Sequence, residues 1–549
     1  MVDKNNTCPI LSFHTENTDI LVLGSGIAGY QAARMAANDG LSVSIVGLAK
    51  GASPYVLGFN AALENGSAGD SIAQFYNDTF SGGYEIGDRT LVHTVTQEAR
   101  IAYQELQALG VPFEMNSEGP ALRHLSGSRY PRSVYVKSGT GNAILSAISK
   151  AAAQLGVKEY LGLRVVSLIK VDKRVCGALA FNRHSGELTA FLAANVILAT
   201  GGIGGLYDDS TYPADVCGDS YALALDAGAT LVDMEFVQFE PTVVSTPLKV
   251  KGMEMPTAML GDGAILVNAH GERFMGRYNF PDYEKRIEKA KLALYIQKEI
   301  DEGRGTDNAS VYFDATGLTP ECLHGYVTHY RRLMNSGVDP AVTPVQIHPA
   351  AHSLMGGVKI DGRCYSGVEG LFVCGEAAGG VHGASRIAGN GASDVIVFGR
   401  VAGKHAQRSL CPLSPAQINR ANEIATEHFA LARQSKFPGD DIPPYIQNIR
   451  QIMASKVGIR RSGVAIKEAV DALESILADI ENAWNGSPLH PLAGHRAAAL
   501  VGLAIASSAF KREESRGAHF RTDFPTLNDE LWKRSNFVKL DKHQGLATL

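Results

Sequence analysis

The chain has 549 residues, enough for on the order of two to four domains, and 45% of them are hydrophobic, as in a well-packed soluble α/β protein. A net charge of −5 provides no basic surface for nucleic acid, and no apolar run of about 18 residues predicts a transmembrane segment. The polar N-terminus lacks a signal-peptide core, and seven scattered cysteines predict a cytoplasmic protein without a metal or iron–sulfur cluster of its own.

The first predicted element is a strand at 19–23 that runs into the segment Gly24-Ser25-Gly26-Ile27-Ala28-Gly29. In this Gly-x-Gly-x-x-Gly pattern, the glycines permit a tight turn and let the backbone approach a pyrophosphate. A helix over 31–39 and a strand over 41–46 complete a βαβ unit, with the phosphates at the helix N-terminus. Gly47 stands where an acidic residue usually binds the ribose of NAD, so the pattern is less typical of an NAD site.

Two later strands end in glycines. The apolar run over 194–202 ends in Gly201-Gly202, and a matching strand is expected at 371–375, before Glu376. A plain loop would explain Gly201-Gly202 alone. Two matching strands that end in this way instead predict further contacts to a bound flavin.

The pattern changes between these strands and again after them. Over 235–345, strand-like stretches and a charged helix at 284–302 interrupt the dinucleotide pattern, which is typical of an insertion that closes as a lid. After Pro412, alternating apolar and charged residues predict helices at 414–435, 443–456, 464–485 and 493–511. The last residues are polar and predict an extended tail.

Several long motifs occur in order along the chain. They are Gln238-Phe239-Glu240-Pro241-Thr242, Gly271-Glu272-Arg273-Phe274-Met275, Ala351-His352-Ser353, Arg386-Ile387-Ala388-Gly389-Asn390 and Glu513-Glu514-Ser515-Arg516-Gly517-Ala518-His519. With them the chain resembles the flavoprotein subunits of the succinate dehydrogenase and fumarate reductase family, which includes L-aspartate oxidase. The resemblance implies an α/β fold: a Rossmann-type FAD-binding domain (1–234 and 346–410), an inserted α+β capping domain (235–345), a C-terminal helical domain (411–535) and a tail (536–549).

The resemblance also implies site residues. Glu376 would bind the ribose of FAD, Asn390 would lie along the flavin, and Arg386 and His352 would hold a substrate carboxylate. A guanidinium fork matches a carboxylate in shape and charge. A structural salt bridge for Arg386 and a core position for His352 are the alternatives. The implied FAD contacts are Gly24, Gly26, Ile27, Ala28, Gly29, Gly58, Thr200, Gly201, Gly202, Gly375, Glu376, Asn390 and Gly391.

Four positions depart from the family pattern. Glu240 replaces a substrate-binding histidine, Lys289 aligns with an arginine that donates a proton, and Thr257 aligns with a glutamate. The histidine that holds FAD covalently in membrane-bound members aligns near Gly51, so we expect noncovalent FAD.

The first two departures bear on the substrate. Glu240 suits a substrate with one acid group and one amino or hydroxyl group, unless it pairs with Lys289 or Arg277. Lys289 either carries the proton as a catalytic group or belongs to a solvated helix face.

These features predict an FAD-dependent oxidoreductase that transfers a hydride between a small carboxylic acid and the flavin. Oxidation at Cα and reduction or desaturation of a Cα–Cβ bond both remain open. One alternative is a flavoprotein subunit that passes electrons to an iron–sulfur partner. A flavin-binding scaffold without catalysis is another.

Overall fold

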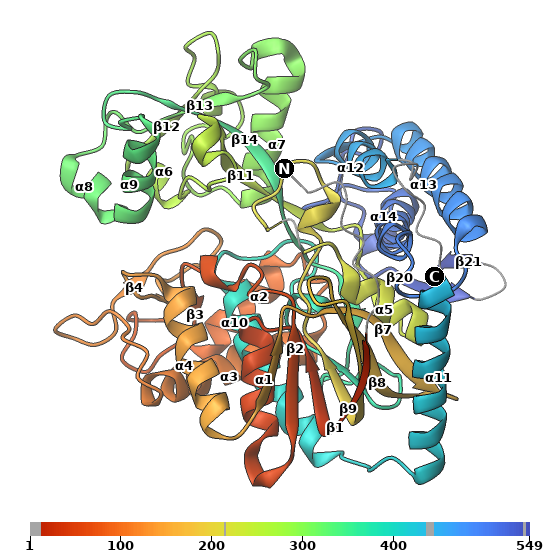
Figure 1. The fold of residues 1–549 in the computed structure, drawn as a ribbon. Helices are drawn as coiled ribbons and strands as arrows, with labels where there is room; N and C mark the ends of the chain where they lie inside the picture. The colour runs from red at the N-terminus through yellow and green to blue at the C-terminus, as the bar shows by residue number, and fades with distance from the viewer. Residues whose placement is uncertain (1–11, 214–215, 435–443, 542–544) are drawn as a thin grey trace.

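A computed structural model describes residues 12–213, 216–434, 444–541 and 545–549. In Figure 1 the FAD-binding domain lies below, the capping domain (green) stands above it, and the C-terminal helices (blue) lie beside both.

The FAD-binding domain is built on a seven-stranded sheet in the order β6-β2-β1-β9-β8-β7, with β16 paired to β9. The apolar strand β1 becomes completely buried over its last residues, as expected for a strand covered on both faces. The strands are β1 (Ser12–Leu23), β2 (Val43–Gly47), β6 (Lys158–Leu161), β7 (Arg164–Val171), β8 (Arg174–Asn182), β9 (Glu187–Leu198) and β16 (Leu371–Val373). The helices are α1 (Ile27–Ala36), α2 (Ile72–Gly82), α3 (Arg89–Ala108), α4 (Thr140–Gln154), α5 (Asp219–Ala227) and α10 (Asn390–Arg408), and a small sheet holds β3 (Phe59–Asn60), β4 (Leu122–Arg123) and β5 (Ser133–Val134).

The register of this sheet decides where the glycine motifs lie. β1, β9 and β16 run parallel, and Leu23 and Val373 both pair with Leu198. The three strands therefore end at the same level. Ligands of open α/β sheets bind outside the carboxyl ends of their strands. The segments after 23, 198 and 373 are thus brought to one edge, although they lie far apart in sequence.

The capping domain has its own sheet, in the order β11-β14-β13-β12, and its own buried cluster. The strands β11 (Val237–Thr246) and β14 (Val345–Leu354) carry the chain into and out of the domain and pair antiparallel. Because β14 belongs to this sheet, the return to the FAD-binding domain lies near its end, later than the expected boundary at 345. The other elements are β12 (Ile265–Val267), β13 (Val311–Asp314), α6 (Ala258–Asp262), α7 (Lys289–Glu299), α8 (Pro320–Gly325) and α9 (Val327–Ser336).

The charged helix expected at 284–302 begins later, at Lys289. Arg286 has a left-handed backbone (φ 53°), which ends regular structure before the helix. The Glu284 carboxylate accepts a hydrogen bond from the Leu266 amide and pairs with Arg273, so this residue belongs to the sheet side. A wider turn over Ile300–Arg304 follows the helix. Lys289 is consequently the first helical residue.

The four predicted C-terminal helices are present as α11 (Pro415–Gln434), α12 (Tyr445–Lys456), α13 (Gly463–Ala483) and α14 (Ala493–Lys511), while the predicted ends at 435 and 443 lie outside the described residues. The described side chains of α11 cover β7–β9, where Ala421 and Ala425 join a buried cluster with Ile169 and Leu179. Among the described residues, α14 is the one helix that length and composition alone would allow to cross a membrane. Some 61% of that window is buried inside the protein, as in a core helix.

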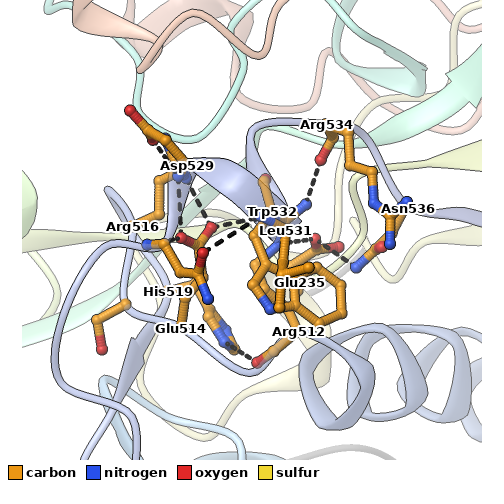
Figure 2. Close-up of polar contacts among 12 residues, drawn as sticks. Glu235, Arg512, Glu514, Arg516, His519, Asp529, Leu531, Trp532, Arg534 and Asn536 are labelled. Carbon is orange, nitrogen blue, oxygen red and sulfur yellow. Dashed lines mark hydrogen bonds and ion pairs between the residues drawn. The ribbon is translucent and has the colours of Figure 1, made fainter.

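The motif at 513–519 forms a buried network of charges, shown in Figure 2. Arg512 pairs with Glu235 at 2.6 Å and with Glu514 at 3.0 Å, and Arg516 pairs with Glu514 and Asp529. Glu235 lies just before β11. Removing one partner of a buried pair would leave the other charge buried without compensation, which is costly. This network therefore connects the C-terminal segment to the start of the capping domain.

The chain end, expected to be an extended tail, pairs with the rest of the protein instead. β20 (Phe537–Asp541) runs antiparallel to β10 (Leu231–Val232), and β21 (Gly545–Thr548) pairs with β20. The same sheet contains β15 (Gly357–Lys359) and β17 (Ala378–Gly379). Val538 is fully buried and supplies the apolar anchor that the polar composition did not suggest. The short pair β18 (Arg460–Arg461) and β19 (Phe520–Arg521) and helix α15 (Asp529–Trp532) lie in the same C-terminal region.

Candidate active site

The edge formed by β1, β9 and β16 is packed so closely that only glycine fits at its turns. A Cβ on Gly29 would lie 1.8 Å from the carbonyl oxygen of Gly24, and one on Gly24 (φ +118°) would lie 2.2 Å from that of Ala199. A Cβ on Gly375 would touch Ala28 at 2.8 Å. The first and last glycine motifs therefore pack against each other at the start of α1, where backbone N–H groups favour a pyrophosphate.

The middle of this edge carries polar groups of the kind that a bound ligand would engage. The hydroxyl of Thr200 is buried and has no hydrogen-bond partner among the described residues. Gly201 is left-handed (φ +84°), and a Cβ on Gly202 would lie 2.2 Å from the carboxylate of Glu376. Glu376 accepts hydrogen bonds from the Tyr212 hydroxyl (2.7 Å) and the Leu354 amide (3.1 Å). Its burial raises the pKa of its carboxyl group to about 7. These residues fit a dinucleotide laid across the strand ends.

Asn390, Gly391 and Gly58 complete the expected cofactor set at the start of α10 and before β3. The Asn390 amide donates to Thr79 at 3.0 Å and accepts from Asn60 at 2.7 Å, so its side chain is fixed by the protein. A Cβ on Gly391 would lie 3.0 Å from a guanidinium nitrogen of Arg386, and one on Gly58 would meet β5 at 2.7 Å. Gly391 therefore leaves room for Arg386 at the N-terminus of α10.

The two strands that enter and leave the capping domain carry Glu240 and His352. Glu240 is 1% exposed, and its Oε2 lies 4.0 Å from Nε2 of His352. On its other side, Nδ1 of His352 lies 2.9 Å from the Thr211 hydroxyl and 3.5 Å from Oε1 of Glu254. Burial and the nearby charges of Arg386 and Lys289 hold the pKa of His352 well below its usual value. His352 is therefore neutral at pH 7.

Lys289 lies inside the site and not on a solvated helix face. Its side chain is 13% exposed, against 55% for Lys291 and 83% for Arg286 in the same charged stretch. Its ammonium forms an ion pair with the Glu240 carboxylate. Arg277, the other candidate partner of Glu240, pairs with Glu272 and Glu299.

Arg386 retains free binding capacity. It donates to the Ser353 hydroxyl at 3.3 Å, while its buried Nε has no hydrogen-bond partner. Among the described residues it has no carboxylate within ion-pair distance. A largely enclosed guanidinium without an anion is costly, so this arrangement suits an anionic ligand.

Glu254 was missed by sequence reasoning. The family's glutamate aligns with Thr257, whereas the structure places Glu254, earlier in the chain, against His352. Burial and the nearby Glu240 raise the pKa of Glu254 to about 7. An acidic residue three positions before Thr257 was the available signal, but only its packing against His352 brings Glu254 into the site.

The same three side chains could also hold a cation. Ligand atoms of Glu240, Glu254 and His352 lie within 4.8 Å of one another. Lys289 already places a positive charge on Glu240. A metal ion would have to compete with that ammonium.

This fold and this site define an FAD-dependent oxidoreductase. A family model described as "FAD binding domain" matches residues 19–392, and one described as "Fumarate reductase flavoprotein C-term" matches residues 446–549. The chain belongs to the FAD-dependent flavoprotein family that contains fumarate reductase, succinate dehydrogenase and L-aspartate oxidase.

Its relatives extend over nearly the whole chain. One of the subunits of the fumarate reductase (CoM/CoB) of Methanothermobacter marburgensis is 34% identical, over 94% of this chain and 96% of that protein. The L-aspartate oxidase of Streptomyces coelicolor is 31% identical, over 96% of this chain and 92% of that protein. The structure of Mycobacterium smegmatis Sdh1 in complex with UQ1 is 30% identical with a TM-score of 0.85, covering 98% of this chain and 94% of that one.

Proposed function

We propose that the protein oxidises or reduces a small organic acid that carries one carboxylate near Arg386. The observation that carries this proposal is the partly unpaired guanidinium of Arg386 beside a neutral His352. Lys289 and Glu240 cancel each other's charge, and Glu254 is only partly ionised near pH 7. The site is thus left with a net positive charge of less than one, supplied by Arg386, which suits a single carboxylate.

FAD supplies the group that accepts or gives a hydride at a substrate carbon. Arg386 would hold the carboxylate by two parallel hydrogen bonds, and His352 would add a hydrogen bond as neutral imidazole. Glu240 would act on Lys289 by fixing its ammonium, and would not grip the substrate itself. Glu254, which is partly exposed, would accept a hydrogen bond from a substrate amino or hydroxyl group.

Lys289 would move the coupled proton at its Nζ atom. It is the one lysine that the structure places within ion-pair distance of a site carboxylate in the described chain. A lysine side chain held within hydrogen-bond reach of the reacting group can serve as its general acid or base. Lysine keeps the positive charge and the N–H donors of the arginine that the family pattern has at this position, without its planar fork.

The test is anaerobic flavin spectroscopy with the purified holoenzyme. Amino acids, hydroxy acids and saturated diacids are added to the oxidised form, and unsaturated acids to the dithionite-reduced form. We expect bleaching by one class or reoxidation by an unsaturated acid, which also sets the direction of the reaction. If no acid in either panel changes the flavin spectrum, the proposal is wrong.

We further propose that the FAD is held without a covalent bond, as Gly51 offers no side chain to form one. Acid precipitation should release all the flavin into the supernatant. Flavin that stays with the precipitated protein would contradict this.

A second candidate is a role within a larger complex, in which the protein passes electrons to an iron–sulfur protein. It is supported by the similarity to Sdh1 and to one of the subunits of a fumarate reductase. Under this proposal the protein would copurify from its host with a cysteine-rich partner, and air would reoxidise its reduced flavin slowly. Fast reoxidation and a single-chain preparation would favour a free-standing oxidase. Cell fractionation would test the accompanying proposal that the protein is cytoplasmic.

A further inference from the structure

The turn after α2 has an unusual backbone. Tyr84 (φ 59°) and Glu85 (φ 58°) are consecutive left-handed residues, and neither is glycine. Side chains with a Cβ rarely adopt this conformation, and such residues concentrate where a site must be held in a particular geometry. The contacts of this turn show what its geometry holds in place.

Both residues reach out of the FAD-binding domain. The Tyr84 hydroxyl donates a 2.6 Å hydrogen bond to the carboxylate of Glu288 in the capping domain. The Glu85 carboxylate forms a 2.6 Å ion pair with Lys533 in the C-terminal region. Extended or helical backbone would point these two side chains in other directions. The strained turn thus lies where three parts of the molecule meet.

Tyr84 acts at the start of the helix that carries Lys289. Glu288 is the residue that precedes α7. Its side chain makes no capping hydrogen bond to the helix, and its Oε1 also pairs with the exposed Lys291 at 3.1 Å. Nearby, the Ser126 hydroxyl donates to the carbonyl oxygen of Ile287 at 3.0 Å. The first residue of α7 is therefore held from the FAD-binding domain by two hydrogen bonds to the residues just before it.

Leu292 and Ile296 anchor one side of α7 in the buried cluster of the capping domain, whereas another side is incompletely packed. A cavity of about 310 Å³ separates one side of α7 from the C-terminal segment 515–527. Its lining includes Tyr84, Glu288, Leu294, Tyr295, Arg516 and Leu527. An incompletely packed face leaves a helix room to shift, so directional bonds at its end matter more than they would in a filled core.

The same turn also supports the loop that carries Arg386. The Ala384 amide donates to the carbonyl oxygen of Gly83 at 3.0 Å. A Cβ on Gly383 would lie 2.3 Å from that oxygen, so the loop lies directly against the turn. Tyr84 also packs on the buried cluster that contains Ala384 and Phe236.

We propose that Tyr84 is a positioning residue that, through Glu288, fixes Lys289 relative to Arg386. The turn contacts both the helix and the loop that carry these cations, and so sets the distance between them across the domain boundary. The inference rests on the proposed role of Lys289 as the proton carrier. It adds a residue that touches neither substrate nor flavin.

The first test is Tyr84→Phe in the FAD-loaded protein, with Tyr326→Phe as the matched control. Tyr326 likewise donates to a carboxylate, that of Asp262 at 2.5 Å, but within the capping domain. For Tyr84→Phe we expect kcat to fall about tenfold with KM changed less than about twofold, as for a misplaced catalytic group. We also expect faster hydrogen–deuterium exchange over 289–296, whereas Tyr326→Phe leaves both unchanged. A Tyr84→Phe protein that matches the control in rate and exchange overturns the proposal.

A double-mutant cycle tests the same Tyr84–Glu288 hydrogen bond through its acceptor. Glu288→Ala should lower kcat by a similar factor, and the double variant Tyr84→Phe/Glu288→Ala should be no worse than the poorer single variant. If the double variant instead loses kcat by the product of the two single-variant factors, the proposal is overturned. If Tyr84→Phe does not fold, Glu288→Ala with its exchange pattern decides the question.

Lys289→Met, measured alongside, separates this inference from the proposed function. If Lys289→Met keeps its rate, the proposed proton carrier is wrong, and exchange over 289–296 still shows whether Tyr84 holds the helix. If Lys289→Met is inactive while Tyr84→Phe retains full rate, the positioning role alone is wrong.

Discussion

The FAD-facing edge of the large sheet and the junction beside the capping domain are built by different means. The edge consists of three parallel strand ends in one hydrogen-bonded register, with glycines that leave room for a ligand. The junction consists of side chains from β11, β14, α7 and the loop before α10, joined by ion pairs and long hydrogen bonds. One region is specified by backbone geometry and the other by charge.

This difference predicts how substitutions will affect each region. A side chain added at the edge collides with backbone that cannot move, so it should affect FAD retention and folding together. A side chain lost at the junction leaves a buried charge without its partner while the sheet stays intact, so it should lower both rate and stability without loss of FAD. The following substitutions test that division.

The largest effect is expected for Lys289→Met. Loss of the proton carrier should lower kcat by about 10²- to 10⁴-fold, the usual contribution of general acid–base catalysis. FAD content should stay normal. Steady-state kinetics with the substrate found by flavin bleaching provides the measurement, and Lys285→Met, an exposed lysine just upstream, is the control. A loss of only a few-fold would mean that the proton travels by another group.

Arg386→Ala should lower kcat/KM more than tenfold, because a bidentate charged contact contributes about 2 kcal/mol or more. Arg386→Lys should restore part of this loss, since lysine keeps the charge without the planar fork. An Arg386→Ala enzyme with nearly normal kcat/KM would show that the carboxylate lies elsewhere.

At the cofactor edge, Gly29→Ala should destabilise the protein by about 1–3 kcal/mol, since its methyl group would overlap the Gly24 carbonyl oxygen. The ratio of flavin to protein absorbance and the thermal midpoint should fall together. Gly261→Ala is the control, because a Cβ there meets nothing within 4 Å. Normal flavin content in Gly29→Ala would contradict the proposed place of the pyrophosphate.

The smallest effect concerns pH. Burial raises the pKa of Glu254 to about 7, so its carboxyl group is neutral below pH 7 and negative above it. A new negative charge repels a carboxylate substrate, so KM should rise a few-fold as the pH passes upward through 7. Glu254→Gln should flatten this profile. If the titration persists in that variant, Glu376, whose pKa is also raised to about 7, becomes its source.

Much of the fold was predictable because its signals are local. The strand–glycine–helix pattern at 19–29 and the four amphipathic C-terminal helices follow from residues adjacent in sequence, and the structure has them within a few positions. The chain end was harder. Val538 is buried by pairing with β10, a partner about 300 residues earlier, and the polar composition gave no sign of it.

The site divides in the same way. The sequence by itself determined which strands end in glycine and that FAD is the cofactor. It also identified the candidate residues of the active site as Arg386, His352, Glu240 and Lys289. Only the tertiary structure decided that Lys289 pairs with Glu240 and that Glu254, not Thr257, faces His352. The physical reason is that periodicity and turn chemistry act over a few residues, whereas the pairing of charges depends on distances between elements far apart in the chain.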